Sequence, residues 1–261
     1  MITPASSLLV ADIVDRFVFF LWPMIRISAL LMIAPVLSIN AVTVRIRVVL
    51  AFALTWLIYP LVEWPALDPT TPAGLLEVFN QVAIGALMGL MLQVAMAAVV
   101  VGGHAIAASM GLAMANMMDP NLGNVPVISQ FLVIMASLIF LGLGGHALLL
   151  QLLLESFHLL PIGQSLLSLD AMGHLIAWSS MMFIGGVLLS LPILVILLTV
   201  NLGLGVVTRA APTLNIFAVG FPAMIIAGFL ILYAGMNSIA ARIQWLWMSA
   251  FEQIRMILGL Q

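Results

Sequence analysis

The sequence predicts an all-α integral membrane protein made of kinked helical hairpins, and two observations predict this fold class. First, 65% of the 261 residues are hydrophobic and 6% are charged, with a mean hydropathy of +1.31. A soluble domain carries about 25% charged residues, so this chain cannot cover itself with a water-facing surface. Second, its apolar runs far exceed the roughly 9–11 residues of a membrane β-strand. Because about 20 residues span the hydrocarbon core, the length accommodates about six spanning helices.

The expected helices follow from the apolar runs, taken in order along the chain. The third run is too long for one helix, and Gly102-Gly103-His104 predicts a break in its middle. Residues 63–77 and 119–126 are rich in Pro, Asp and Gly and predict loops. Glycine pairs inside the apolar runs are explained by close helix packing. The runs comprise residues 17–39, 48–62, 78–118, 127–154, 171–208 and 216–236.

The C-terminal tail, residues 238–261, differs from these runs because its pattern is amphipathic. Apolar side chains at helical spacing form one stripe, and charged residues lie off it. We expect this tail to lie at a membrane interface or to dock on a partner, with Trp245 and Trp247 as anchors at the lipid headgroups. The stripe comprises Ile239, Ile243, Trp247, Ala250, Ile254 and Leu258.

Charge and chemistry exclude several classes of function. All seven basic residues are Arg, and the net charge of −2 offers no basic patch for nucleic acid. The chain has no Cys, and its four His lack metal-ligand spacing, so neither a metal site nor a cofactor is expected. No phosphate-binding Gly-rich loop and no activated nucleophile is recognisable, so the sequence does not predict an enzyme. Asp12 and Asp15 stand where a signal peptide would be positive, so no cleaved signal is expected.

A simple serial topology does not satisfy the positive-inside rule. Placing Arg45 and Arg47 in the cytoplasm puts the tail with Arg242 and Arg255 on the opposite side. Two interpretations remain: one segment is a hairpin that does not cross, or the protein is not a serial bundle in lipid.

Two features are candidates for function. Arg26 lies near the middle of its apolar run, where a cation costs about 2.5–3.5 kcal/mol, so we expect it to face a partner or water. The alternative is a buried structural ion pair, or a position at shallower depth. The second feature is a group of methionines that runs into an Asp-Pro turn. These side chains are either ordinary helix packing or a deformable plug beside a pathway, because Met adapts to irregular and changing contacts. The group comprises Met110, Met114, Met117 and Met118, followed by Asp119 and Pro120.

Four blocks in register resemble the FliR family, the flagellar members of the type III secretion export-gate proteins. No single block is decisive, but their order and spacing cover nearly the whole chain. The blocks are residues 26–35 with the Arg pair and Tyr59-Pro60 that follow, residues 111–120, residues 140–163, and residues 201–222.

The resemblance implies a non-enzymatic core component of the flagellar export gate at the inner membrane, in the basal body. Its expected partners are FliP, FliQ, FlhB, membrane lipid and the unfolded flagellar proteins that pass through the channel. The resemblance further implies a FliP-like part over residues 1–170, with a plug loop at about 105–126 that contains the methionine group. A FliQ-like hairpin with the amphipathic tail then covers residues 171–261.

In the implied gate, helices pack on neighbouring subunits rather than on lipid, which would accommodate both Arg26 and the unsatisfied topology. Arg209 is a structural polar residue that pairs either within the chain or across a subunit boundary. The alternative function is a small-molecule secondary transporter of the inner membrane. That class should show inverted repeats with paired broken helices, and no convincing repeat is visible here.

Overall fold

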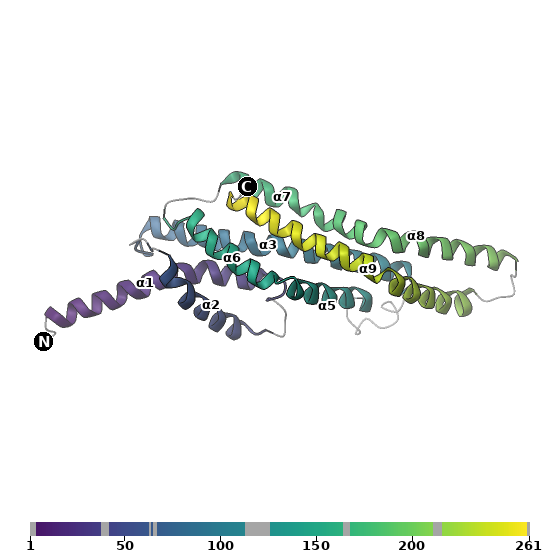
Figure 1. The fold of residues 1–261 in the computed structure, drawn as a ribbon, viewed down its shortest axis with the longest axis horizontal. Helices are drawn as coiled ribbons and strands as arrows, with labels where there is room; N and C mark the ends of the chain where they lie inside the picture. The colour runs from purple at the N-terminus through teal and green to yellow at the C-terminus, as the bar shows by residue number, and fades with distance from the viewer. Residues whose placement is uncertain are drawn as a thin grey trace. The chain divides into compact units, whose positions relative to one another are not determined.

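The computed structural model describes the main chain of residues 4–37, 42–62, 64, 67–112, 126–163, 168–210 and 216–259, with side chains except at 4–16, 169 and 216–219. Within these ranges the regular structure is entirely helical, which confirms the all-α prediction. The helices are α1 (Pro4–Ile33), α2 (Val44–Ile58), η1 (Tyr59–Leu61), α3 (Pro72–Ser109), α5 (Val127–Gly142), α6 (Gly145–Leu159), α7 (Leu169–Ser179), α8 (Met181–Ala210) and α9 (Ile216–Leu258) (Figure 1).

Four helical segments in the described part of the chain are long and apolar enough to cross a membrane. The pair α5 and α6 adds a fifth span if its two helices are counted together, and residues Phe17–Ile33 form a shorter apolar helix. The length of the chain had suggested about six membrane-spanning helices. The described part of the chain has fewer candidate spans, and several of them are longer than expected. The four segments are Val44–Leu61, Pro72–Ser109, Asp170–Ala210 and Gly220–Leu258.

Helix α3 begins earlier than the sequence analysis expected. Thr71 accepts a hydrogen bond from the backbone N–H of Gly74 (3.1 Å), and Pro72 occupies the first helical position. A Thr N-cap followed by Pro is a favourable helix start, since Pro lacks the N–H that would go unused there. The expected loop over residues 63–77 therefore ends at Thr71, and Glu77 lies within a helix.

The chain divides into two compact units. The first comprises residues 1–93, 146–178 and 250–261, and the second comprises residues 94–145 and 179–249. Helices α3 and α9 each contribute to both units. These units are each made of several separate stretches of the chain, whereas the predicted FliP-like and FliQ-like parts divide the chain once, at residue 170. That division stays a prediction.

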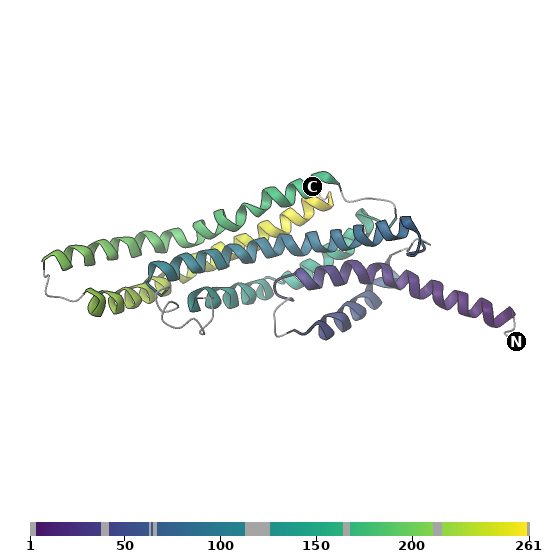
Figure 2. The same cartoon turned by 180° about the vertical axis from the view of Figure 1, so that it is seen from behind.

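In the first unit, α1 lies beside α2 and packs closely on α3 (Figures 1 and 2). Gly85 and Gly89 of α3 are four residues apart and share one helix face. A Cβ at Gly85 would come within 3.1 Å of the Arg26 carbonyl carbon, and one at Gly89 would lie 2.9 Å from Ile33 Cβ. The two glycines therefore let the α1 backbone approach α3 closely.

In the second unit, the predicted break at Gly102-Gly103-His104 is wrong, because α3 continues through these residues to Ser109. Both glycines are instead sites of close helix approach. A Cβ at Gly102 would lie 3.0 Å from the Gly186 carbonyl oxygen of α8, and one at Gly103 would lie 2.6 Å from Ser129 Cα of α5. A flanking helix on each side thus explains the glycine pair without a turn.

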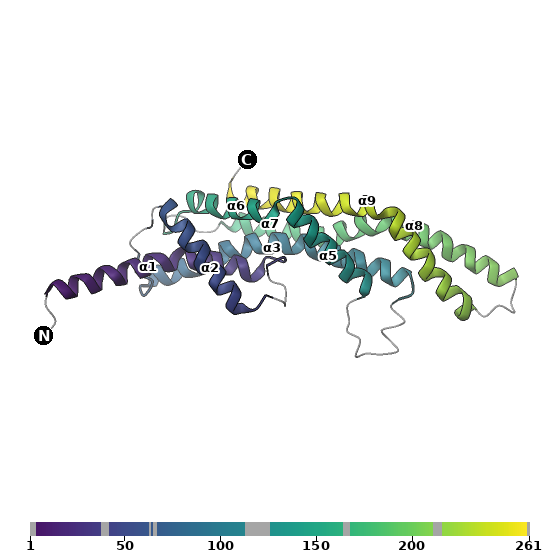
Figure 3. The same ribbon diagram turned by 60° about the horizontal axis from the view of Figure 1, so that its bottom comes forward.

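Helix α9 lies beside α8 in this unit (Figures 1 and 3). The six stripe residues predicted for the tail are all buried, which confirms the stripe, but the tail continues directly from the preceding apolar run as one helix. Trp247 is not a headgroup anchor. It is 1% exposed, and its Nε1–H donates to the Ala136 carbonyl of α5 (3.0 Å), while Trp245 is 42% exposed.

Candidate functional site

The predicted plug begins at the C-terminal end of α3, and the structure describes this end up to Leu112. Met110 lies within the described residues. The other predicted plug residues lie outside them, and their role stays a prediction; they are Met114, Met117, Met118, Asp119 and Pro120.

Helix α3 ends in a well-defined Schellman motif. The N–H of Gly111 donates to the Ala108 carbonyl (3.0 Å), and the N–H of Leu112 donates to the Ala107 carbonyl (3.1 Å). Gly111 has φ = +80°, the left-handed conformation that this motif requires at its turning residue and that glycine adopts without a Cβ penalty. Two carbonyls of the last helical turn, those of Ala107 and Ala108, are therefore satisfied.

Two contacts join this end of α3 to α9. Met110 is fully buried, and its side chain fills the notch that Gly228 leaves on α9. A Cβ on Gly228 would lie 2.6 Å from Met110 Cγ and 2.8 Å from its Sδ. Next to it, a Cβ on Gly111 would come within 3.2 Å of the Phe221 ring. The backbone at the start of the predicted plug thus packs directly on α9.

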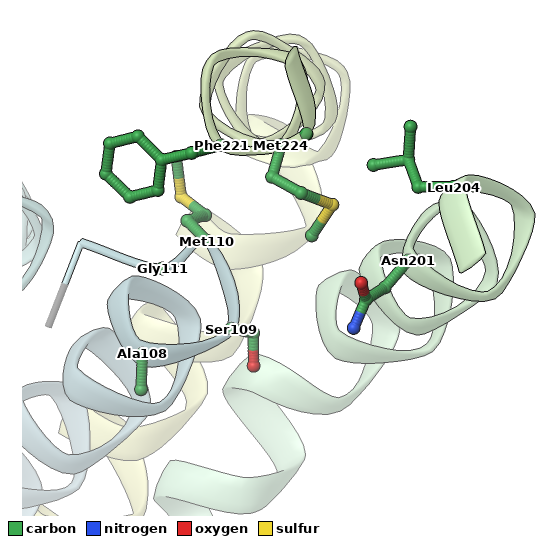
Figure 4. A pocket seen from close by; sticks show the side chains of 9 residues that line it. Ala108, Ser109, Met110, Gly111, Asn201, Leu204, Phe221 and Met224 are labelled. Carbon is green, nitrogen blue, oxygen red and sulfur yellow. The ribbon is translucent and has the colours of Figure 1, made fainter. Parts of the chain in front are cut away.

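Beside this contact lies a cavity of about 350 Å³ among the end of α3, α8 and α9. In Figure 4 the Asn201 amide of α8 and the Ser109 hydroxyl lie on one side of it, with Met110, Phe221 and Met224 on the other. The Ser109 hydroxyl donates to the Ala105 carbonyl (3.0 Å). The lining is Ala108, Ser109, Met110, Gly111, Asn201, Leu204, Gly220, Phe221 and Met224.

Arg26 belongs to a separate polar site in the first unit, and it is fully buried. Its Nε donates to Gln81 Oε1 (2.7 Å), one terminal nitrogen donates to the Ser156 carbonyl (2.7 Å) and hydroxyl (3.0 Å), and the other donates to the Leu160 carbonyl (2.8 Å). The guanidinium carbon also lies 4.3 Å from the centre of the Phe157 ring. Arg26 therefore caps the C-terminal end of α6, where the helix dipole favours a cation.

The negative charge that compensates Arg26 is the Glu77 carboxylate of α3, and the Gln81 side chain bridges the two. Gln81 accepts from Arg26 and donates through Nε2 to the Glu77 carboxylate, and the Asn80 amide lies 3.3 Å from the same carboxylate. The sequence analysis missed Glu77, Gln81 and Ser156. The spacing of Glu77 and Gln81, one helical turn apart at the start of a long apolar run, was a usable signal for the first two.

Arg209 lies exposed in the last turn of α8, where the helix dipole also favours a positive charge. It lies in the second unit and is not part of the Arg26 network. Among the described residues, no group of three or more His, Cys, Asp or Glu is placed to hold a metal ion.

These features define the class of protein first: an all-helical membrane protein, with a polar network sealed inside one unit and a helix end fixed beside a cavity in the other. Residues 17–250 match the family described as bacterial export proteins, family 1. The chain is 38% identical to the flagellar biosynthetic protein FliR of Pectobacterium carotovorum over 222 residues, 85% of each chain. It is 35% identical to that of Escherichia coli K12 over 92% of each chain, and 32% identical to that of Bacillus subtilis 168 over 95% of this chain and 98% of the relative.

The chain belongs to this family of bacterial export proteins and, within it, to the FliR proteins of the flagellum. It is accordingly a membrane-embedded component of flagellar protein export. This confirms the resemblance found in the sequence.

Proposed function

We propose that this chain is a core, non-enzymatic subunit of the flagellar type III export gate in the bacterial inner membrane. Together with FliP and FliQ, and with FlhB alongside, it forms the channel through which unfolded flagellar proteins leave the cell. The segment that follows Gly111 is the plug that closes this channel. Opening moves the plug aside without chemistry on the substrate, and other components supply the energy.

The observation that carries the plug proposal is that the described residues before and after 113–125 pack within one unit. At one end, the Schellman motif and Met110 fix α3 on α9. At the other end, α5 begins at Val127, and its Ser129 packs on Gly103 of α3 and donates to the Val100 carbonyl (3.1 Å). The sequence between these two helix ends contains three methionines, which suit a deformable seal because Met side chains repack around irregular contents.

The exposed face of α8 supports assembly with other subunits. Four of its many exposed apolar residues recur every three or four positions, so they lie along one side of the helix between Val195 and Val206. A membrane-embedded face of this kind contacts either lipid or the helices of neighbouring subunits, and the proposal assigns it to neighbouring subunits. These four residues are Val195, Leu198, Leu202 and Val206.

Co-purification tests the assembly. A tagged chain expressed with FliP, FliQ and FlhB should elute with them as one particle, and when expressed alone it should aggregate or elute without a defined size. A stable, monodisperse chain that binds a small molecule without partners would favour the secondary-transporter alternative and refute the proposal.

Ion conductance tests the plug in the assembled gate. Replacing Met114, Met117 and Met118 by Ser should make membranes that contain the gate leaky to ions, because Ser cannot form an apolar seal. The matched variant with Leu at the same positions keeps apolar side chains of similar size and should stay closed. Equal, low conductance in the Ser and Leu variants would contradict the plug assignment.

A further inference from the structure

We propose that Met110 and Gly228 form a latch that holds the start of the plug in place, and that release of Met110 from the Gly228 notch accompanies opening. This inference rests on the proposed plug function, but its geometry lies wholly within the described second unit. It assigns a positioning role to two residues that the sequence patterns do not single out as a pair.

The closed position of the latch is defined by complementary shapes. Met110 is fully buried at the end of α3, and its Cγ and Sδ occupy the space that a side chain at position 228 would need. The next residue, Gly111, has φ = +80° and is the turning residue of the motif that ends the helix. Any movement of the Met110 side chain out of the notch therefore acts on the backbone at the point where the plug begins.

The open position is provided by the adjacent cavity. Met110 itself lines this space of about 350 Å³, so the thioether can leave the notch without first displacing a neighbouring side chain. Methionine has three rotatable side-chain bonds and suits a contact that forms and breaks repeatedly. The cavity is lined by Asn201 of α8 as well as by Phe221 and Met224 of α9, so a released Met110 side chain would enter a space between these two helices (Figure 4).

The test uses Gly228→Ala, whose Cβ would occupy the notch and expel Met110. Gly235→Ala is the matched control, because it lies two turns further along the same helix and its Cβ would meet its nearest neighbour at 3.9 Å. The chain contains no Cys, so Leu112→Cys provides a single thiol in this chain just after the turn. The readout is the rate at which a maleimide labels this thiol in the assembled gate.

The latch predicts labelling at least about fivefold faster with Gly228→Ala than with Gly235→Ala, the factor set by the low end of overpacking effects. Equal rates would overturn the latch. If Gly228→Ala does not assemble, Met110→Ala empties the notch without a clash and should accelerate labelling similarly, and no acceleration there also overturns the proposal. When Gly228→Ala and Met110→Ala are combined, the rate of thiol labelling should match that of Met110→Ala alone.

Conductance of the same variants separates the latch from the plug. Faster labelling with raised conductance supports both. Faster labelling with unchanged conductance supports the latch as a structural contact and counts against the plug function on which its role depends.

Discussion

Replacing Arg26 tests the interpretation that a buried cation caps α6 and is balanced by Glu77. Arg26→Ala removes four hydrogen bonds, leaves the carbonyls of Ser156 and Leu160 without this cap, and leaves the Glu77 carboxylate without its counter-charge. Removing one partner of a buried charge pair costs about 3–5 kcal/mol. For a chain of this size, that loss corresponds to a fall of roughly 6–20 °C in melting temperature.

The assay is the temperature at which half of a fluorescently tagged chain leaves the gate complex in size-exclusion chromatography. Arg26→Lys should lose part of the stability, because one ammonium group cannot reach acceptors that lie on three sides of the guanidinium. Arg255→Ala is the control: this residue is exposed in α9, and its loss should change stability by no more than about 0.5 kcal/mol.

A double variant separates charge balance from simple packing. Arg26→Met with Glu77→Gln removes both charges and keeps similar side-chain volume, so it should regain at least half of the stability lost in Arg26→Met alone. The reasoning is refuted if Arg26→Ala melts at the wild-type temperature. It is also refuted if the effects of the two charge-removing substitutions simply add.

Two further predictions use the same melting assay, and a third uses proteolysis. Gly85→Ala should destabilise by about 1–3 kcal/mol because its Cβ meets the α1 main chain, whereas Gly203→Ala, with open space around it, should not destabilise. Trp247→Phe should cost about 1 kcal/mol through its lost hydrogen bond to α5, and Trp245→Phe at an exposed site should cost little; equal effects would contradict the buried assignment. The backbone N–H and hydroxyl of Thr70 donate to the Asp68 carboxylate and lower its pKa. The ionised carboxylate therefore stabilises this turn fully at a pH above the ordinary carboxyl pKa, and this stabilisation is lost as the pH falls through the lowered pKa. Proteolysis of the loop should increase on acidification in the wild type, but not in Asp68→Asn.

The helical class and the buried stripe of α9 were predictable because both depend on local sequence. Composition excludes a water-covered surface, and a period of 3.6 residues identifies the face that Ile239, Ile243 and Ile254 bury. The start of α3 was also readable, since Thr71-Pro72 is an N-cap followed by Pro at the first helical position. It was missed because the prolines of this region were all interpreted as turn formers.

The error at Gly102-Gly103 has a physical reason. Glycine weakens an isolated helix, but a helix pressed between two others gains more from close approach than it loses in conformational entropy. A glycine pair can end a helix or let neighbouring helices approach it closely. Here the neighbours are Gly186 and Ser129, which lie far along the chain. Sequence alone does not bring these residues together.

The candidate site was predictable in part. The sequence indicated that Arg26 needs a partner, but its acceptors lie 55, 130 and 134 residues away, and two of them are backbone carbonyls whose identity no sequence pattern encodes. Met110 was predicted as part of a methionine group. Its packing against Gly228 was not predictable, because it depends on the register between α3 and α9. The turn at Gly111 could have been read from a Gly that follows a long apolar run.

The cap that Arg26 places on α6 also concerns the order of events during synthesis. The Leu160 carbonyl is made 134 residues after Arg26, and at about 5–20 residues per second this is a delay of about 7 to 27 s. Gln81 is made 55 residues after Arg26, but the Ser156 and Leu160 acceptors follow only at the end of this interval, so the cation of α1 lacks most of its acceptors until then. The contacts that hold the first translated helix to α6 thus form only after more than half of the chain has been made, and biogenesis of this subunit must tolerate an unfinished N-terminal segment until α6 is complete.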